Sequence, residues 1–307
     1  MSLLSLIKGR RGASGHGFAS TAEDVTDGVD LKGKTILITG VNSGLGQESA
    51  RVLASRGAHI VGAARTLEKA AEGCGAIDGE TTPVACELSE PALVRACVDA
   101  LRQKGQKFDV LLCNAGIMAL PELEQKHGYE LQFLTNHIGH FILVTGLLDT
   151  LANDGRVVML SSGAHAMPYK EGIQFDNLSG EAEYSGWRAY GQSKLANLLF
   201  TRELARRFEG STKTANAVHP GVIATNLGRH MSTAIQILFA PVGLLGQKSI
   251  SQGAATQCYV AAHPDAGKIS GEYFADCNVA PSSAHGQDRD MAKRLWEISE
   301  EIAAGLN

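Results

Sequence analysis

Several features that would assign a protein class at once are missing from this chain of 307 residues. Its six cysteines form no C-x-x-C pair and no disulfide-dense pattern, so we expect reduced thiols and a cytoplasmic location. No apolar run approaches the roughly 20 residues that a membrane-spanning helix needs. The short apolar run over residues 3–7 precedes its basic residues instead of following them. We therefore expect neither a transmembrane anchor nor a signal peptide.

The chain also lacks an excess of positive charge. Lysine and arginine number 28 against 32 acidic residues, which gives a formal net charge of −4 at pH 7. A nucleic-acid partner is therefore not expected. His137 and His140 have an H-x-x-H spacing, but zinc needs three or four converging ligands and no acid or cysteine lies at a suitable spacing. We predict no metal site and expect these histidines to serve packing or a dimer helix.

Glycine, by contrast, is abundant, and short apolar runs alternate with helical patterns. The 35 glycines make up a larger share of the 307 residues than the roughly 7% that is usual in proteins. The alternating runs are residues 35–39, 47–55, 59–64, 91–102, 110–113, 138–148 and 156–160. Such a βαβ rhythm predicts an α/β fold, a doubly wound parallel sheet of the Rossmann type, in a single domain over residues 31–307. Residues 1–30 read as a flexible N-terminal extension with a short helix near Thr21.

A glycine-rich turn follows the first predicted strand. Its spacing is G-x-x-x-G-x-G, where a tight turn and an open helix N-terminus would let a pyrophosphate approach. The predicted contact residues are Gly40, Asn42, Ser43, Gly44, Leu45 and Gly46. Taken alone, such a glycine trio also fits an ordinary turn.

Three later strand ends should line the same crevice. The second predicted strand ends in Arg65, where a guanidinium would accommodate a 2′-phosphate and no carboxylate competes for a 2′-hydroxyl. This favours NADP(H) as cofactor, while NAD(H) stays open. The other predicted cofactor contacts at strand ends are Glu87, Leu88, Asn114, Ala115 and Gly116.

A second group of residues could carry proton chemistry. Tyr190 and Lys194 are four apart, which places them on one face of a helix. A nearby ammonium should lower the pKa of the phenol and make it a usable proton donor. Ser162 could hold a substrate carbonyl oxygen by a hydrogen bond. A lone Y-x-x-x-K arises often by chance, so the pair indicates a catalytic site only in combination with other motifs.

In this order along the chain, the motifs resemble the short-chain dehydrogenase/reductase superfamily. They are Thr39-Gly40-x-x-x-Gly44-x-Gly46, Asn114-Ala115-Gly116, Asn136, Ser162, Tyr190-x-x-x-Lys194 and Pro220-Gly221. Within this superfamily, the chain is similar to the retinol dehydrogenase and WW-domain-containing oxidoreductase group. The likeness is carried by Asn136-His137-Ile138-Gly139-His140 and by His219-Pro220-Gly221-Val222. One departure is Glu87, where the family usually has aspartate.

The resemblance implies a seven-stranded sheet and particular roles. Tyr190 would be the acid/base, Lys194 would lower its pKa and bind the nicotinamide ribose, Ser162 would orient the substrate oxygen, and Asn136 would hold a relay water. Further cofactor contacts are implied at Pro220, Gly221, Val222, Ile223 and Thr225. A substrate loop at about residues 222–250 is also implied. Independently of the resemblance, the apolar pattern of residues 291–304 predicts a C-terminal amphipathic helix that packs on the domain.

These readings predict an enzyme that transfers a hydride between NADP(H) and a lipophilic aldehyde or ketone, or the corresponding alcohol. The lipophilic substrate is suggested by the apolar residues of the loop, which could also serve a core or a dimer contact. Homodimerisation through residues 136–148 and 190–208 is a family-level expectation. Two alternatives stay open: an NADP(H)-binding redox sensor with little turnover, and an NAD-dependent alcohol dehydrogenase.

Overall fold

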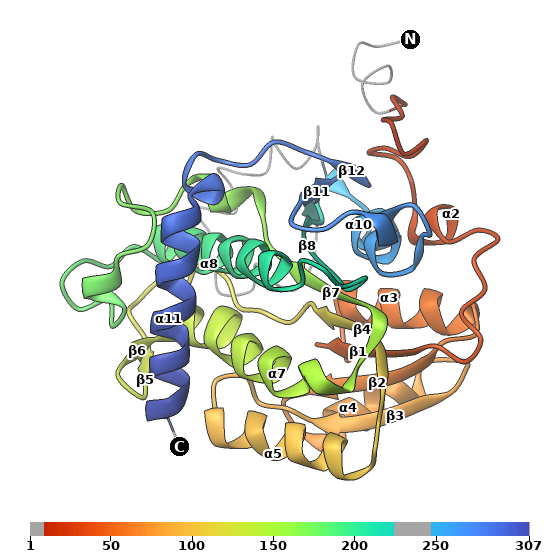
Figure 1. The fold of residues 1–307 in the computed structure, drawn as a ribbon, viewed down its shortest axis with the longest axis horizontal. Helices are drawn as coiled ribbons and strands as arrows, with labels where there is room; N and C mark the ends of the chain where they lie inside the picture. Colours follow the sequence, from red (N-terminus) through yellow and green to blue (C-terminus); the bar gives the residue numbers. More distant parts are fainter. Residues whose placement is uncertain (1–8, 224–246, 307) are drawn as a thin grey trace.

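The computed structural model describes residues 9–223 and 247–306, and its centre is a mostly parallel sheet (Figure 1). The strands run in the order β12-β11-β8-β7-β4-β1-β2-β3. Their bounds are β1 Thr35–Thr39, β2 His59–Ala64, β3 Thr81–Ala85, β4 Phe108–Cys113, β7 Leu151–Leu160, β8 Thr214–His219, β11 Tyr273–Ala275 and β12 Asn278–Val279. The predicted doubly wound α/β fold in one domain is therefore confirmed.

The sheet is one strand larger than the resemblance implied. Seven strands pair in parallel, and β12 adds an antiparallel edge to β11 through a tight turn. Asp276 and Cys277 fill this turn with φ values of 50° and 63°. Two small pairs complete the strands: antiparallel β5 (Gln125–Lys126) with β6 (Tyr129–Glu130), and parallel β9 (Val222–Ile223) with β10 (Gln247–Lys248).

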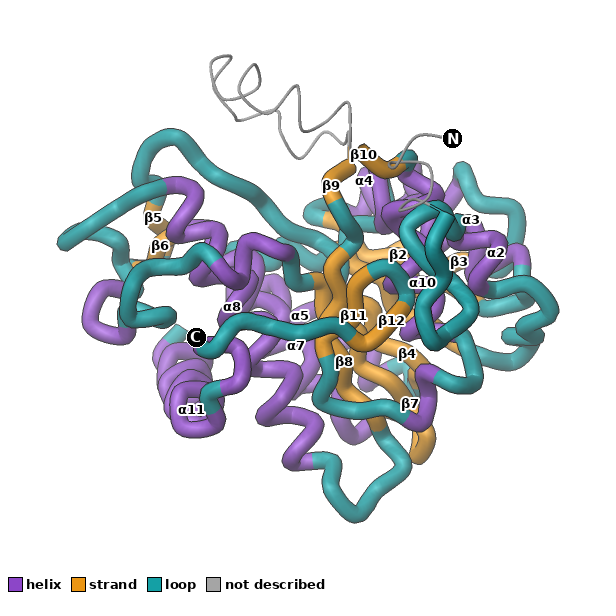
Figure 2. The backbone as a smooth tube through the Cα atoms, turned by 90° about the horizontal axis from the view of Figure 1, so that it is seen from above, coloured by secondary structure: helices purple, strands orange, loops and turns teal. Residues whose placement is uncertain are grey.

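Helices cover both faces of the sheet (Figure 2). The α-helices are α2 Ala22–Val25, α3 Gly44–Ser55, α4 Leu67–Gly75, α5 Pro91–Gln103, α6 Leu131–Phe133, α7 Gly139–Leu147, α8 Gly186–Arg207, α10 Ile250–Ala262 and α11 Arg289–Gly305. A π-helix, η1, spans Leu134–Ile138, and short 3₁₀ turns are η2 Leu148–Thr150, η3 Gly163–Ala166, η4 Phe175–Asn177, η6 Ala266–Lys268 and η7 His285–Gln287.

The two faces of the sheet form two hydrophobic layers. Leu37 of β1 packs in the layer with α5, α7, α8 and α11, whereas its neighbours Ile36 and Ile38 pack in the layer with α2, α3 and α10. This is the period-two alternation of a strand that is buried on both faces. All six cysteines are free and buried, three in each layer.

The C-terminal helix α11 closes the first layer. Asp288 caps its N-terminus by accepting the Met291 backbone N–H at 2.9 Å. Trp296 then stacks on Phe200 of α8 at 5.4 Å between ring centroids and meets Phe141 of α7 edge-on at 5.1 Å. As predicted, this helix packs on the domain, and it covers part of the two helices through which a homodimer was expected.

The core reaches further toward the N-terminus than residue 31. Helix α2 has the predicted Thr21 cap, and its Ala22 and Val25 are buried against α3 and α10. Upstream, the Asn278 side chain accepts the backbone N–H of Ser14 at 2.9 Å and donates to the His16 carbonyl at 3.1 Å. Hydrogen bonds therefore hold the segment around Ser14 and His16 against β12, at the edge of the sheet.

One helical stretch, Leu131–Thr150, is apolar enough by length and composition to cross a membrane. The most apolar part of this stretch is largely buried inside the domain, and its Phe133, Phe141 and Val144 belong to the core. This is the behaviour of a central core helix, and within the described residues no second stretch passes the same test.

Candidate active site

The glycine-rich turn lies between β1 and α3, as predicted. Gly40 and Gly44 have φ values of 75° and 56°, in the left-handed region that favours glycine. A Cβ on Gly46 would lie 2.2 Å from the Gly40 carbonyl oxygen and 2.6 Å from the Asn114 amide nitrogen. The G-x-x-x-G-x-G spacing therefore reflects two backbone conformations and one close approach between α3, the turn and the end of β4.

Polar contacts join this turn to the next strand of the sheet. The Thr39 hydroxyl accepts the backbone N–H groups of Asn114 and Ala115 at 2.9 and 3.0 Å. The Asn114 side chain donates to the Thr39 carbonyl at 2.9 Å and accepts from Gln257 of α10 at 3.2 Å. Gln257 was not predicted from the sequence, because no local motif marks a residue that lies 143 positions from Asn114 and supports the turn.

These residues fit a nicotinamide dinucleotide. Helix α3 begins after Ser43 without a side-chain cap, which leaves its first N–H groups available for an anion. Arg65 is exposed directly after β2, and Glu87 is half-buried after β3, where it accepts from the Ser89 backbone and hydroxyl. The structure thus lines up the predicted contacts along the carboxyl ends of β1, β2 and β3, with Asn42, Leu45 and Leu88 beside them.

The predicted catalytic side chains come together on α8 and its neighbours. The Lys194 ammonium nitrogen lies 5.7 Å from the centroid of the Tyr190 ring and donates to the Leu160 carbonyl at 3.1 Å. Tyr190 shares a hydrogen bond with Ser162. A Cβ on Gly116 would lie 3.3 Å from the lysine nitrogen, so the end of β4 reaches this group. The predicted cofactor contacts and the predicted catalytic side chains therefore lie together in one site.

Burial sets the protonation of this pair. Burial raises the pKa of Tyr190 to about 12, with the Ser162 hydrogen bond acting against it, and lowers the pKa of Lys194 to about 8. The direction for Tyr190 is opposite to the expectation that Lys194 lowers its pKa. The physical reason is that removal from water penalises the phenolate more than the neighbouring lysine, itself buried, favours it. Tyr190 is therefore a protonated phenol at neutral pH.

The two neighbouring serines point in different directions. Ser161 is buried and donates to the Lys194 carbonyl at 2.8 Å, which fastens β7 to α8. Ser162 is half-buried and faces Tyr190, while its oxygen accepts the Ala164 N–H at 3.2 Å. Of the two hydroxyls, that of Ser162 can reach a substrate oxygen beside the phenol.

Asn136 lies in the π-helix η1, a wider turn that is frequent at functional sites. Its side chain accepts the Ile117 N–H at 2.8 Å and donates to the Ile117 carbonyl and the Ser193 hydroxyl, both at 2.9 Å. Ser193 in turn donates to the Tyr190 carbonyl at 2.8 Å. Ser193 lies inside the Y-x-x-x-K motif and joins Asn136 to α8, a role that was not predicted from the sequence.

The segment after β8 supplies the remaining predicted contacts. Gly221 has a φ of 93° and lies against the buried side chain of Lys248, which pairs with Asp276 at 2.6 Å. Pro220 and Ile223 are half-buried, and Val222 is 54% exposed. Thr225 and most of the predicted substrate loop lie outside the described residues.

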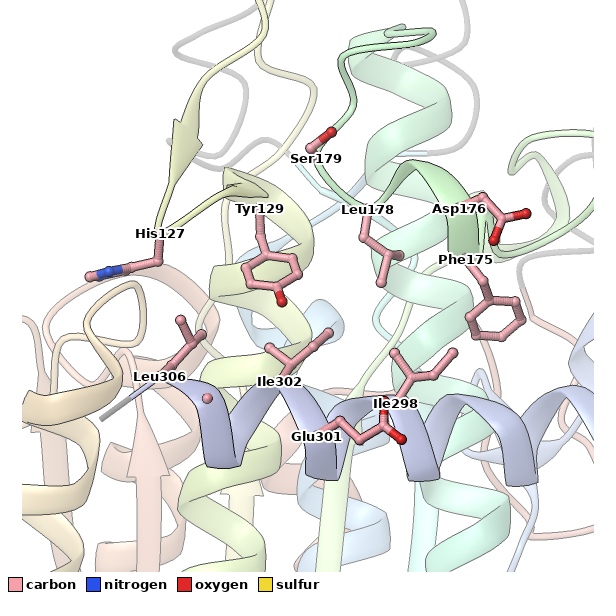
Figure 3. A pocket seen from close by; sticks show the side chains of 11 residues that line it. His127, Tyr129, Phe175, Asp176, Leu178, Ser179, Ile298, Glu301, Ile302 and Leu306 are labelled. Carbon is pink, nitrogen blue, oxygen red and sulfur yellow. The ribbon is translucent and has the colours of Figure 1, made fainter.

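A groove of about 580 Å³ lies apart from this site, between the β5–β6 pair, η4 and the end of α11 (Figure 3). Tyr129, Leu178 and Ile302 point into it, with His127 and Glu301 at its edge. None of the predicted site residues lines it, so the chemistry is assigned to the strand ends and not to this groove.

Comparison with known proteins agrees with the geometry. The family described as short chain dehydrogenase matches residues 34–236. The short-chain dehydrogenase TIC 32 A, chloroplastic, of Brassica napus is 42% identical over the full length of both chains. Human retinol dehydrogenase 14 is 39% identical, over 90% of this chain and 88% of its own.

Solved structures show the same architecture. A crystal structure of an uncharacterised protein from Mycobacterium paratuberculosis is 33% identical, covers 93% of this chain and 98% of its own, and has a TM-score of 0.75. A blue fluorescent protein from a metagenomic library, crystallised in complex with NADPH, is 26% identical with a TM-score of 0.64 and covers 80% of this chain and 97% of its own.

Proposed function

Because the chain belongs to the short-chain dehydrogenase family, we propose that it is an NADP(H)-dependent oxidoreductase that interconverts a lipophilic aldehyde or ketone and the corresponding alcohol. The observation that carries the proposal is the meeting of Ser162, Tyr190 and Lys194 beside Gly116, in the segment that follows β4. A protein that only bound the cofactor would not need a protonated phenol and a half-exposed hydroxyl at that place.

The chain's own residues would handle the proton. The nicotinamide, when bound, supplies or accepts the hydride. In the reductive direction Ser162 would hold the substrate oxygen and the Tyr190 hydroxyl would donate its proton to it. Lys194, beside the ring, would stabilise the phenolate that is left, and Asn136 would keep α8 and the Ile117 segment in register.

Arg65 supports NADP(H) over NAD(H), together with the NADPH held by the similar metagenomic protein. The lipophilic substrate is supported by the apolar sequence between residues 223 and 245 and by the names of the retinol dehydrogenases, which are 36–39% identical. The name of the Brassica napus relative assigns that protein to the chloroplast, so a cytoplasmic location stays a prediction for this chain.

The test is an initial-rate assay that follows NADPH absorbance against long-chain aldehydes, retinal-like enals, steroid ketones and small ketones. We expect turnover to rise with the apolar size of the carbonyl compound. Tyr190→Phe should lower kcat by at least about 100-fold, because it removes the proton donor but keeps the ring. Tight NADPH binding with no turnover in either direction would overturn the proposal and favour a redox sensor.

Arg65 gives a separate prediction about the cofactor. Arg65→Ala should weaken NADPH binding roughly 10- to 100-fold, since charge-assisted hydrogen bonds to the 2′-phosphate are lost, and should leave NADH binding almost unchanged. Titration of cofactor fluorescence measures both dissociation constants. Lys69→Ala is the matched control, because it removes an exposed cation from α4 close by. An equal loss for both cofactors, or no loss, would contradict the assignment.

A further inference from the structure

His140 occupies the first turn of α7, directly after the π-helix, and is completely buried. Its Nδ1 atom lies 2.9 Å from the backbone carbonyl oxygen of Asn136. Its Nε2 atom lies 2.9 Å from the hydroxyl of Thr39, at the end of β1. The ring therefore bridges a residue of the catalytic group and a residue of the cofactor turn, without lining either binding surface itself.

The contacts of Thr39 fix where the protons lie. A hydroxyl has one proton and two lone pairs. The Thr39 oxygen already accepts two backbone N–H groups, those of Asn114 and Ala115. Its own proton must therefore be donated to Nε2 of His140, which leaves the ring proton on Nδ1, where it is donated to the Asn136 carbonyl. The chain of hydrogen bonds has one consistent direction.

The surroundings keep this ring neutral. Burial lowers the pKa of His140 to about 4; the hydrogen bond to Asn136 acts against this, and the charge of Lys194 adds to it. A protonated ring would also direct a second N–H at Thr39, whose oxygen has no lone pair left. His137, the other histidine of the H-x-x-H pair, instead faces the Ser299 hydroxyl of α11 at 2.8 Å.

We propose that His140 is a positioning residue: as the neutral Nδ1–H tautomer it holds the backbone of Asn136 at a fixed place relative to Thr39, and so keeps the proton-handling side chains in register with the cofactor turn. The connection runs from Thr39 through His140 to Asn136, whose side chain reaches Ser193 and thereby the Tyr190 turn of α8. The kinetic consequence rests on the proposed oxidoreductase function; the tautomer does not.

Two substitutions separate positioning from packing. His140→Leu keeps a buried side chain but can neither accept from Thr39 nor donate to Asn136. His140→Gln can do both, with its amide oxygen and its N–H. We expect His140→Leu to lower kcat roughly 10- to 100-fold with a smaller change in KM, because a slight displacement of Asn136 misaligns the site, and His140→Gln to recover most of that loss.

His137→Gln is the matched control, because it alters a buried histidine of the same motif that contacts α11 and not Thr39. Urea unfolding of all three variants shows whether each one folds. Equal kinetic losses in His140→Leu and His140→Gln, with normal unfolding curves, would overturn the positioning role. So would an unchanged kcat in His140→Leu.

A second measurement does not depend on turnover. In ¹⁵N-histidine NMR of the wild-type protein, we expect His140 to show a protonated Nδ1 and an unprotonated Nε2, unchanged between about pH 8 and about pH 5. His140→Gln identifies the signal by its disappearance. An Nε2–H tautomer, or titration in that range, would overturn the inference even if the enzyme is active. Absence of turnover in the wild-type protein would instead refute the proposed function and leave the tautomer result standing.

Discussion

Replacement of Lys194 by methionine should make the protein more stable and nearly inactive. The lysine is 2% exposed, and burial lowers its pKa with no carboxylate among the described residues acting against it. Its hydrogen bond to the Leu160 carbonyl can be lost at little cost, because Asn197 also donates to that oxygen, at 3.1 Å. Methionine has a similar length and no charge, so it can fill the space without the penalty of a buried ammonium.

The pH dependence of the effect has a definite sign. Burial lowers the pKa of Lys194 from 10.5 to about 8, which corresponds to a penalty on the order of 3 kcal/mol for the charged folded state. Between these two values the unfolded chain binds the proton and the folded chain does not, so wild-type stability rises with pH there. The advantage of Lys194→Met is therefore largest below pH 8 and shrinks as pH rises toward 10.5.

Urea unfolding of both proteins measures the difference. At about pH 7 we expect Lys194→Met to raise the free energy of unfolding by roughly 1–3 kcal/mol, and at about pH 10 by much less. Its kcat should fall at least about 100-fold. Lys69→Met, at an exposed position, should leave both quantities unchanged. A lower free energy of unfolding for Lys194→Met at neutral pH would contradict this prediction, because it would show that the buried ammonium stabilises the folded state.

Replacement of Trp296 by alanine should cost about 3–5 kcal/mol of unfolding free energy, the usual range for a buried tryptophan. The ring is 4% exposed and packs against Phe141 and Phe200, and the Arg207 guanidinium lies 4.0 Å from its centroid. Its loss would uncouple α11 from α7 and α8. Circular dichroism during urea unfolding measures the change, and Trp187 remains as a fluorescent reporter.

Trp296→Phe is the control for this result. The indole N–H of Trp296 is buried and finds no hydrogen-bond partner in the described structure, so phenylalanine keeps the ring contact and removes a polar group that gains nothing there. We expect it to cost less than about 1.5 kcal/mol. Light scattering of Trp296→Ala tests the surface beneath: association beyond the wild-type state would show that α11 covers an interface between copies.

The sequence was a good guide where a local pattern encodes the structure. The G-x-x-x-G-x-G spacing predicted the turn between β1 and α3. Each glycine is required there by a local backbone feature, either a positive φ or a close approach of another backbone segment. The alternation of short apolar runs predicted the sheet, and Tyr190 and Lys194 lie together because a helix brings every fourth residue round. Such features need no knowledge of distant segments.

Other features depend on pairs of residues that are far apart in the chain. Nothing near Gln257 or Ser299 indicates that the first would brace Asn114 and the second would face His137. The π-helix around Asn136 has a sequence that an ordinary helix would also accept. The pKa of Tyr190 moved opposite to expectation because spacing reveals a neighbouring lysine but not the depth of burial.

Because the six thiols divide evenly between the two hydrophobic layers, their modification can report on local opening of each layer. Cys86, Cys97 and Cys113 belong to the layer with α7 and α8, and Cys74, Cys258 and Cys277 belong to the layer with α3 and α10. Burial raises the pKa of Cys113 and Cys258, so neither reacts as a thiolate until its surroundings open. The order in which an alkylating reagent modifies Cys113 and Cys258, one in each layer, would therefore record which side of the sheet loosens first.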